Sequence, residues 1–295
     1  MPYDFVQVDA FTNRPLYGNP AAVVFDADDI PAETMQKIAQ EMNLSETVFI
    51  LKPNHPDADY RVRIFTPKNE LPFAGHPTVA AAHSVLARFS EKSSTKLLRQ
   101  ECGIGIVPVE VIRSDSGTLL RMTQGTPEYR SVNLSRDTMA MMLGCAERDL
   151  GEHPFEVVST GVPWLIVELT HFATISDLNP DLGLITQQCK ALKAVGVTVF
   201  VDRSSGDRPR IRVRTFAPGE GIAEDPVCGS GNGSVLAYIV RYKHANEKTG
   251  AYVAEQGIEI GRDGEIHASW EQVHDTLQVR IGGEAAISVS GKLHL

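Results

Sequence analysis

The chain has 295 residues, 42% hydrophobic and 22% charged, a composition typical of a globular protein with room for two domains. Its net charge of −9 argues against nucleic-acid binding through a broad basic face, which leaves small-molecule chemistry as the favoured class. Four cysteines, at positions 102, 145, 189 and 228, show neither CxxC pairing nor metal-ligand spacing. We therefore expect free thiols in a reducing, cytoplasmic setting.

Neither the N-terminus nor any apolar run indicates export or membrane insertion. The opening stretch MPYDFVQVDAF lacks a basic segment and a long apolar core, and no run approaches about eighteen apolar residues. We expect an untargeted, soluble protein with no membrane partner.

In the first half of the chain, β-rich runs alternate with two helical patterns. The first helix is expected at 30–42, with Pro31 near its first turn, and the second at 77–89, where apolar residues recur at helical spacing. The expected strands lie at 4–11, 21–25, 47–51 and 60–65, with several short ones between 96 and 122.

The second half repeats this order. Helices are expected at 182–194 and 229–241, and strands at 155–158, 164–169, 198–201 and 210–216, with more strands to the end. Arginines alternate with other residues just before and within the last of these strands. The alternation predicts that they line one solvated face, at Arg208, Arg210, Arg212 and Arg214.

Matched residues between the halves indicate an internal duplication. An ordered series of matches with a single gap and so long a period favours two similar domains over a solenoid. Because no low-complexity linker separates the halves, we expect the two domains to form a tight pair with a cleft between them. The matches are Thr47/Thr198, Val48/Val199, Phe49/Phe200, Arg63/Arg214, Phe65/Phe216 and Pro67/Pro218 at an offset of 151 (198 − 47 and 214 − 63), then Gly75/Gly229 and Gly103/Gly257 at 154 (229 − 75 and 257 − 103).

Two polar residues of the first half are candidates for chemistry. Glu46, in NLSETVFIL, stands where the second copy has Val197, so the acid belongs to one half only. It is either a functional acid or a solvated loop or capping residue. His76 precedes Pro77 at the start of the expected helix; a lone histidine is most often a structural hydrogen-bonded group, but this one occupies the matched turn of the duplication.

In the second half, Glu224 and Asp225 precede a turn with the sequence PVCGSGNGS. Small residues at a helix start suit a bound carboxylate or phosphate, because unpaired N–H groups and the positive end of the helix dipole point at it. The turn lacks the motifs of a phosphate-binding loop or a dinucleotide site, and a close-packed turn is the simpler alternative. Cys228 is either a thiol with a lowered pKa or a small buried residue. His76 and His83 lack the HExxH spacing, so no metal is expected.

Three motifs, NLSETVF, RIFTPKNELPFAGHPTVAAAH and EDPVCGSGNG, resemble those of the phenazine-biosynthesis PhzF-like isomerases over essentially the whole chain. The resemblance implies an α+β fold like that of diaminopimelate epimerase, with two pseudo-symmetric domains, each a β-barrel-like sheet around a central helix. It also implies that the halves exchange their final strands. The first domain would then comprise 1–116 and 275–295, and the second 117–274.

The family implies a cofactor-independent isomerase, a homodimer, whose active site lies where both central helices begin and takes a small carboxylate substrate. Carried over by motif, Glu46 is the catalytic acid/base that shuttles a proton. The substrate-binding groups, carried over in the same way, are His76, Asp225, Gly75, Gly229 and Ser230. The family's named reaction, isomerisation of trans-2,3-dihydro-3-hydroxyanthranilate, is one candidate.

One departure separates this chain from the racemase and epimerase branches, which pair two catalytic cysteines. Cys228 occupies the second thiol position and is the candidate second acid/base group, but the first position is Ala74. The pattern favours a single base, Glu46. An amino-acid or hydroxy-acid racemase using Cys228 and a non-catalytic carboxylate-binding protein are the two alternatives.

Overall fold

The computed structural model describes residues 2–89, 92, 94–115, 117–202 and 209–295. The chain divides into two compact units, of which unit 1 comprises residues 1–122 and 282–295 and unit 2 comprises residues 123–281. These divisions fall six and seven residues beyond the expected ones (122 − 116 and 281 − 274). The assignment of the units as domains in their own right stays a prediction.

Unit 1 is built on one sheet that the last strand of the chain joins beside the first. β1 pairs antiparallel with β18 and β2, β2 runs parallel to β3, and β4 pairs antiparallel with β3 and parallel with β6. β7 pairs antiparallel with β6 and β8. The strands are β1 (Tyr3–Ala10), β2 (Asn19–Val24), β3 (Glu46–Leu51), β4 (Tyr60–Phe65), β5 (Glu70–Leu71), β6 (Leu97–Cys102), β7 (Gly105–Ser114), β8 (Gly117–Thr123) and β18 (Ala285–Leu293).

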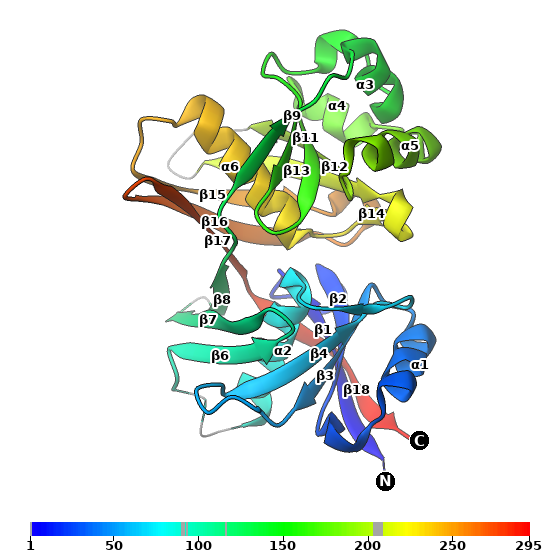
Figure 1. The fold of residues 1–295 in the computed structure, drawn as a ribbon, viewed down its shortest axis with the longest axis vertical. Helices are drawn as coiled ribbons and strands as arrows, with labels where there is room; N and C mark the ends of the chain where they lie inside the picture. The colour runs from blue at the N-terminus through cyan, green and yellow to red at the C-terminus, as the bar shows by residue number, and fades with distance from the viewer. Residues whose placement is uncertain (1, 90–91, 93, 116, 203–208) are drawn as a thin grey trace. The chain divides into compact units, whose positions relative to one another are not determined.

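Helix α2 (Gly75–Arg88) lies among these strands and contacts β1, β2, β3, β6 and β18 (Figure 1). Its residues from His76 to Ala82 are all buried, so the helix is covered around its circumference. The small side chains of Ala80, Ala81 and Ala82 let strands approach it closely. Helix α1 (Ala32–Met42) and the short η1 (Ala27–Asp29) pack elsewhere on the sheet, against a cluster that includes Phe49 and Phe65.

Unit 2 repeats the same order of pairings. β10 pairs antiparallel with β9 and β11, β11 runs parallel to β12, and β13 pairs antiparallel with β12 and parallel with β15, which pairs antiparallel with β16. This repetition confirms the duplication expected from the sequence. The strands are β9 (Glu128–Ser131), β10 (Glu156–Ser159), β11 (Pro163–Glu168), β12 (Gly196–Asp202), β13 (Arg210–Ala217), β14 (Ile222–Asp225), β15 (Thr249–Gln256), β16 (Gly264–Val273) and β17 (Thr276–Gly283).

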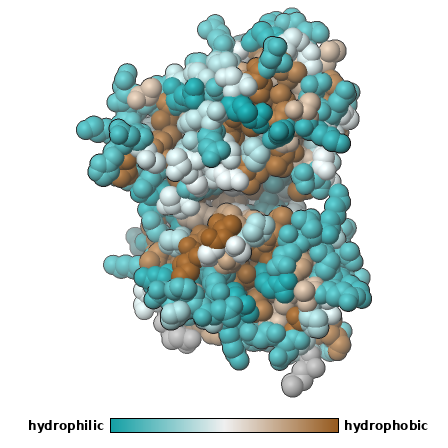
Figure 2. Space-filling model, in the orientation of Figure 1, coloured by the Kyte–Doolittle hydropathy of each residue, from teal (hydrophilic) through white to brown (hydrophobic). Residues whose placement is uncertain are grey.

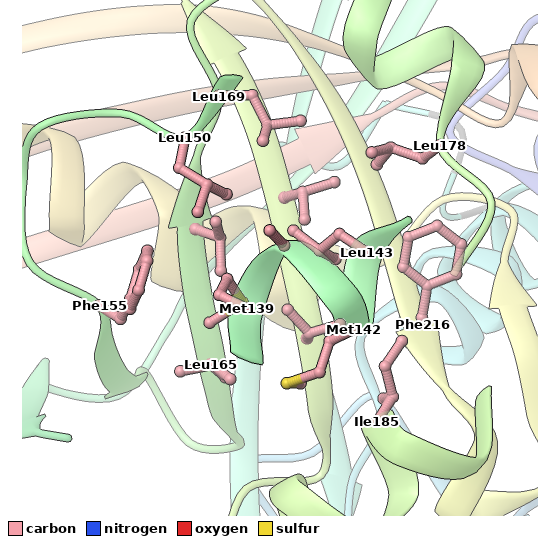
Figure 3. Packing of buried hydrophobic residues seen from close by; sticks show 14 of the residues in the cluster. Met139, Met142, Leu143, Leu150, Phe155, Leu165, Leu169, Leu178, Ile185 and Phe216 are labelled. Carbon is pink, nitrogen blue, oxygen red and sulfur yellow. The ribbon is translucent and has the colours of Figure 1, made fainter. Parts of the chain in front are cut away.

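Helix α6 (Gly229–Lys243) is the central helix of unit 2, buried without a break from Gly231 to Val240 (Figure 1). Three shorter helices, α3 (Arg136–Leu143), α4 (Phe172–Asp177) and α5 (Leu182–Leu192), pack against a separate apolar cluster. Figure 3 shows this cluster, in which Met142 from α3 joins Ile185 from α5 and Phe216 from β13. Apolar side chains of the unit 2 strands are therefore covered by α6 and, separately, by α3, α4 and α5.

Several local expectations differ from the structure. α2 begins at Gly75, two residues before the expected start at Pro77, so that Gly75 and His76 belong to its first turn. The sequence did not predict α3 or α4. Each is short, and its apolar residues pack with other elements without extending a helical period over several turns.

The expected row of solvated arginines was wrong for two of its members. Arg212 and Arg214 are only 5% and 6% exposed, because this face of β13 is covered and each guanidinium meets a carboxylate, Glu259 and Glu224 respectively. Arg210 is partly exposed and pairs with glutamates as well. Arg208 lies outside the described residues.

On the face shown in Figure 2, hydrophilic side chains cover most of the surface. Within the described ranges, no helix combines the length and the apolar character that crossing a membrane requires. All four cysteines are free, as expected.

The unit 2 cluster offers a matched test of packing. Met142 is fully buried in it, whereas its neighbour Met141 is 55% exposed. We expect Met142→Ala to lower the free energy of unfolding by about 2–5 kcal/mol through loss of apolar burial and the cavity left behind. Met141→Ala is expected to change it by less than about 0.5 kcal/mol. Urea denaturation followed by circular dichroism measures both, and equal losses would contradict the packing described.

Candidate active site

In unit 1, a buried carboxyl group lies beside a buried imidazole. Glu46 is the first residue of β3 and is 9% exposed, and His76 is the second residue of α2 and is 7% exposed. The Oε2 atom of Glu46 lies 3.1 Å from Nε2 of His76. Parallel pairing with β2 places Glu46 opposite Ala21. Glu46 is therefore neither a solvated loop residue nor a helix cap.

The start of α2 adds backbone groups to this pair. Gly75 is the first helical residue, and its cap position, Ala74, offers no side-chain acceptor. The helix itself supplies no acceptor for the N–H groups of its first turn, so these and the positive end of the dipole are available to an anion. The first hydrogen bond within the helix is made by Thr78. Its N–H and its hydroxyl both donate to the carbonyl of Ala74, at 3.3 and 2.8 Å.

In unit 2, Cys228 caps the start of α6. Its Sγ accepts a hydrogen bond from the N–H of Gly231 at 3.3 Å, and the residue is 5% exposed. Burial, followed by the negative charge of nearby Asp225, raises the pKa of the Cys228 thiol well above its ordinary value. This direction is opposite to the lowered pKa considered as one alternative from the sequence, and Cys228 is a buried residue that caps the helix.

Gln256, fully buried at the end of β15, joins the acidic loop to the helix start. Its Oε1 accepts from the N–H of Cys228 at 3.2 Å and from the amide of Asn232 at 2.7 Å. Its Nε2 donates to the carbonyl of Asp225 at 2.9 Å. The Asp225 carboxylate in turn accepts from the N–H of Val227 at 3.1 Å. Asp225 is thereby held in a fixed position relative to the first turn of α6.

Sequence reasoning missed Gln256, although a signal was present. The Glu-x-Gly pattern recurs at 101–103 and 255–257, at the offset of 154 already found (255 − 101). The middle residue differs, Cys102 in one copy and Gln256 in the other, and an amide has the hydrogen-bonding capacity that a thiol lacks.

Two further side chains hold the residues expected to bind substrate. The indole of Trp164 donates to the hydroxyl of Ser230 at 3.0 Å, and the amide of Gln124 donates to the carbonyl of Gly229 at 3.1 Å. The residue after Ser230 is Gly231. A Cβ atom at this position would lie 2.9 Å from the hydroxyl oxygen of Thr198. The helix start therefore packs closely against β12.

Each unit contains an arginine that holds the acidic loop ahead of its central helix. Arg63 binds both carboxylate oxygens of Glu70, each at 2.7 Å, and the matched Arg214 binds both oxygens of Glu224, each at 2.8 Å. Arg214 also donates to the carbonyl groups of α4 and its C-terminal cap. Because Glu224 immediately precedes Asp225, we regard Arg214 as a positioning residue.

The structure thus brings the candidate residues together in two groups. Glu46, Gly75 and His76 meet within unit 1, and the others gather at the start of α6 within unit 2, at Asp225, Cys228, Gly229 and Ser230. Among the residues that the structure describes, no set of three or more histidine, cysteine, aspartate or glutamate side chains is arranged to hold a metal ion.

Comparison with known proteins matches nearly the whole chain. The family model described as phenazine biosynthesis-like protein, PhzC-PhzF, matches residues 8–291. An uncharacterised isomerase of Clostridium acetobutylicum is 35% identical over 300 residues, covering 99% of this chain and 98% of the relative. The trans-2,3-dihydro-3-hydroxyanthranilate isomerase of Pseudomonas aeruginosa is 34% identical over 293 residues, covering 99% of each chain.

Solved structures agree with the fold. The PhzF-family phenazine biosynthesis protein of Bacillus anthracis superposes with a TM-score of 0.91 at 27% identity, over 100% of both chains. A hydroxyproline epimerase of Agrobacterium vitis has a TM-score of 0.62 at 14% identity, covering 99% of this chain and 91% of the epimerase, and is similar in fold alone. The expected α+β fold, shared with epimerases, is therefore confirmed.

The two arginine–glutamate pairs make a second matched test. The side chains of Arg214 and Glu224 are 7% and 12% exposed, whereas those of Arg63 and Glu70 are 29% and 41% exposed. Arg214→Met leaves the Glu224 charge buried without its partner, and we expect a loss of about 3–5 kcal/mol in the free energy of unfolding. Arg63→Met, at the exposed pair, is expected to cost about 0–1 kcal/mol. Chemical denaturation compares them, and a larger loss for Arg63→Met would refute the assignment.

Proposed function

Because the chain belongs to the PhzC-PhzF family of phenazine biosynthesis-like proteins and is an isomerase, we propose that it moves a proton within a small carboxylate substrate through the carboxyl group of Glu46. The observation that carries the proposal is the 3.1 Å contact between the buried Glu46 and His76 at the start of α2. A carboxyl group held away from bulk water beside an imidazole suits an acid/base that gives and takes a proton.

In the proposed reaction, the Glu46 carboxylate removes a proton from one carbon of the substrate and returns it to another. His76 holds the carboxyl group in position while it changes protonation state. Positioned acid/base catalysis of this kind typically contributes about 10²–10⁴ in rate, with orientation supplying much of the remainder. The scheme moves only a proton and shifts double bonds, so it is written without a cofactor.

We assign substrate binding to the helix starts. The N–H groups of Gly75, Gly229 and Ser230 suit the substrate carboxylate, since first-turn amides have no acceptor within their own helices. Asp225, held by Gln256, is proposed to accept hydrogen bonds from an amino or hydroxyl group of the substrate.

The relatives support a candidate substrate. The enzyme of Pseudomonas aeruginosa is named for trans-2,3-dihydro-3-hydroxyanthranilate, and we propose this compound as the first candidate to test. It carries the carboxylate, amino and hydroxyl groups that the helix starts and Asp225 would bind. A cytoplasmic setting and a homodimer belong to the same proposal.

The observations disfavour the alternative of a racemase that uses Cys228. Burial raises the pKa of the Cys228 thiol, which disfavours the thiolate that would take a proton from carbon. The matching position in the first copy is Ala74, which supplies no partner. The non-catalytic alternative is not kept, since the relatives are named isomerases.

Replacing the proposed base tests the assignment directly. We expect Glu46→Gln to lower kcat by at least about 10²-fold, since the amide cannot shuttle a proton. Binding of 3-hydroxyanthranilate, an aromatic analogue, should change little, as calorimetry would measure. The matched control is Glu41→Gln, which removes one carboxylate from an exposed site on α1 and should leave kcat unchanged. Equal rates for the two variants would refute the role of Glu46.

The role of Cys228 is tested by a substitution that keeps the helix cap. Serine also accepts a hydrogen bond from the N–H of Gly231, so we expect Cys228→Ser to fold and to retain kcat within about threefold. A loss of two orders of magnitude in the rate of substrate consumption, with folding intact, would instead place the thiol in the chemistry.

A further inference from the structure

A groove in unit 1 lies apart from the Glu46–His76 pair and has a volume of about 470 Å³, within the range of small-molecule sites. It is formed by β4, β5 and the end of β6. The charged side chains that line it are Arg61, Arg63, Glu70 and Glu101, and Cys102 lines it beside them.

Arg61 is the one of these charged groups that the described residues leave without a hydrogen-bonded partner. Its Nε atom is buried and no described residue accepts from it; the same is true of Nε in the matching Arg212, so the difference between the two arginines lies in their terminal nitrogens. Glu70 is committed to Arg63, which it binds through both oxygens. Glu101 faces Arg61 across the parallel pairing of β4 with β6, but its carboxylate accepts from the backbone N–H groups of residues 54 and 55, at 2.7 and 3.1 Å.

The second copy shows what the matching arginine binds. Arg212 corresponds to Arg61 (212 − 61 = 151) and likewise faces a glutamate, Glu255, across a parallel strand pair. Glu255 is committed to Arg210, as Glu101 is to the backbone. Arg212 instead binds the carboxylate of Glu259 at 2.9 Å and lies against the ring of Phe172, 5.5 Å from its centroid.

The described residues of unit 1 include no counterpart for either of these covering groups. Glu259 lies in the connection between β15 and β16, residues 257–263, whereas the connection between β6 and β7 is only residues 103 and 104. Phe172 begins helix α4, whose place in the first copy is taken by the three-residue turn η1 (Ala27–Asp29). The arginine is kept in both copies, but only in the second does a carboxylate hydrogen-bond to it; in the first, Glu101 attracts Arg61 by its charge without a hydrogen bond between the two among the described residues.

From this difference we propose that the groove beside Arg61 binds a small organic carboxylate, which takes the place that Glu259 holds against Arg212 in the second copy. The guanidinium forms charge-assisted hydrogen bonds with such a group, and its fork geometry suits both carboxylate oxygens. The groove has room for a small acid; Glu70 is bound to Arg63 through both oxygens, and one oxygen of Glu101 is bound to the backbone. This site is separate from the proposed isomerase chemistry, and its test does not depend on turnover.

Cys102 provides the measurement, because it lines the groove and is partly exposed. Mass spectrometry of the peptide that contains Cys102 follows its alkylation by iodoacetamide. The alkylation rate in malonate is compared with the rate in sodium chloride at the same ionic strength. At about ten times its dissociation constant, malonate should slow the reaction of Cys102 about tenfold, since only about one protein in ten then has an open groove. Cys145, also partly exposed and outside the groove lining, should react at an unchanged rate in the same sample.

Two charge-matched variants locate the effect. Arg61→Gln should abolish the protection of Cys102 by malonate. Arg148→Gln, which removes an exposed arginine from unit 2, should retain it in full. Equal protection of Cys102 in Arg61→Gln, equal slowing of Cys145, or no slowing of Cys102 in the unaltered protein would each overturn the proposal. The last two outcomes are read on the unaltered chain and do not depend on the folding of a variant.

Discussion

The structure depends on two helices, α2 and α6, that are buried around their circumference. A helix covered on every side must consist largely of small or apolar residues, and the strands of its unit must run around it. Burial also places the first turn of the helix, whose N–H groups have no acceptor within the helix itself, among polar side chains from neighbouring strands. In unit 1 the Glu46 carboxyl group and the His76 imidazole meet at this turn, and in unit 2 Gln256 ties Asp225 to the equivalent turn.

Comparing the two copies separates structural residues from those assigned to chemistry. Both copies keep an arginine–glutamate pair and a glycine packed against the proline before the central helix: a Cβ atom at Gly103 would lie 2.7 Å from Pro72, and one at Gly257 would lie 2.6 Å from Pro226. These shared contacts hold the loops in place. The copies differ at Glu46 and Val197, at Ala74 and Cys228, and in the connection that carries Glu259. The proposed base and the proposed carboxylate site both arise where the duplication has diverged.

The duplication, the free cysteines and the order of the elements other than α3 and α4 followed from the sequence, because residue matches, cysteine spacing and hydrophobic periodicity can be read along the chain. Burial of Arg212 and Arg214 did not, since alternation along a strand tells which side chains share a face but not whether another element covers it. The cap formed by Cys228 and the links made by Gln256 were also beyond sequence reasoning, because each depends on contacts across the fold. The catalytic role of Glu46 stays a prediction that family resemblance and geometry support.

The central claim is a Glu46-dependent transfer of a proton between carbons, and ¹H NMR in D₂O tests it most directly. The pure protein is incubated with trans-2,3-dihydro-3-hydroxyanthranilate, beside a panel of amino and hydroxy acids, and compared with Glu46→Gln. The account predicts that the native protein consumes the cyclohexadiene and that the variant leaves it unchanged. Consumption by both proteins would contradict the claim, as would an untouched cyclohexadiene together with α-deuterium in a panel acid that disappears in Cys228→Ser.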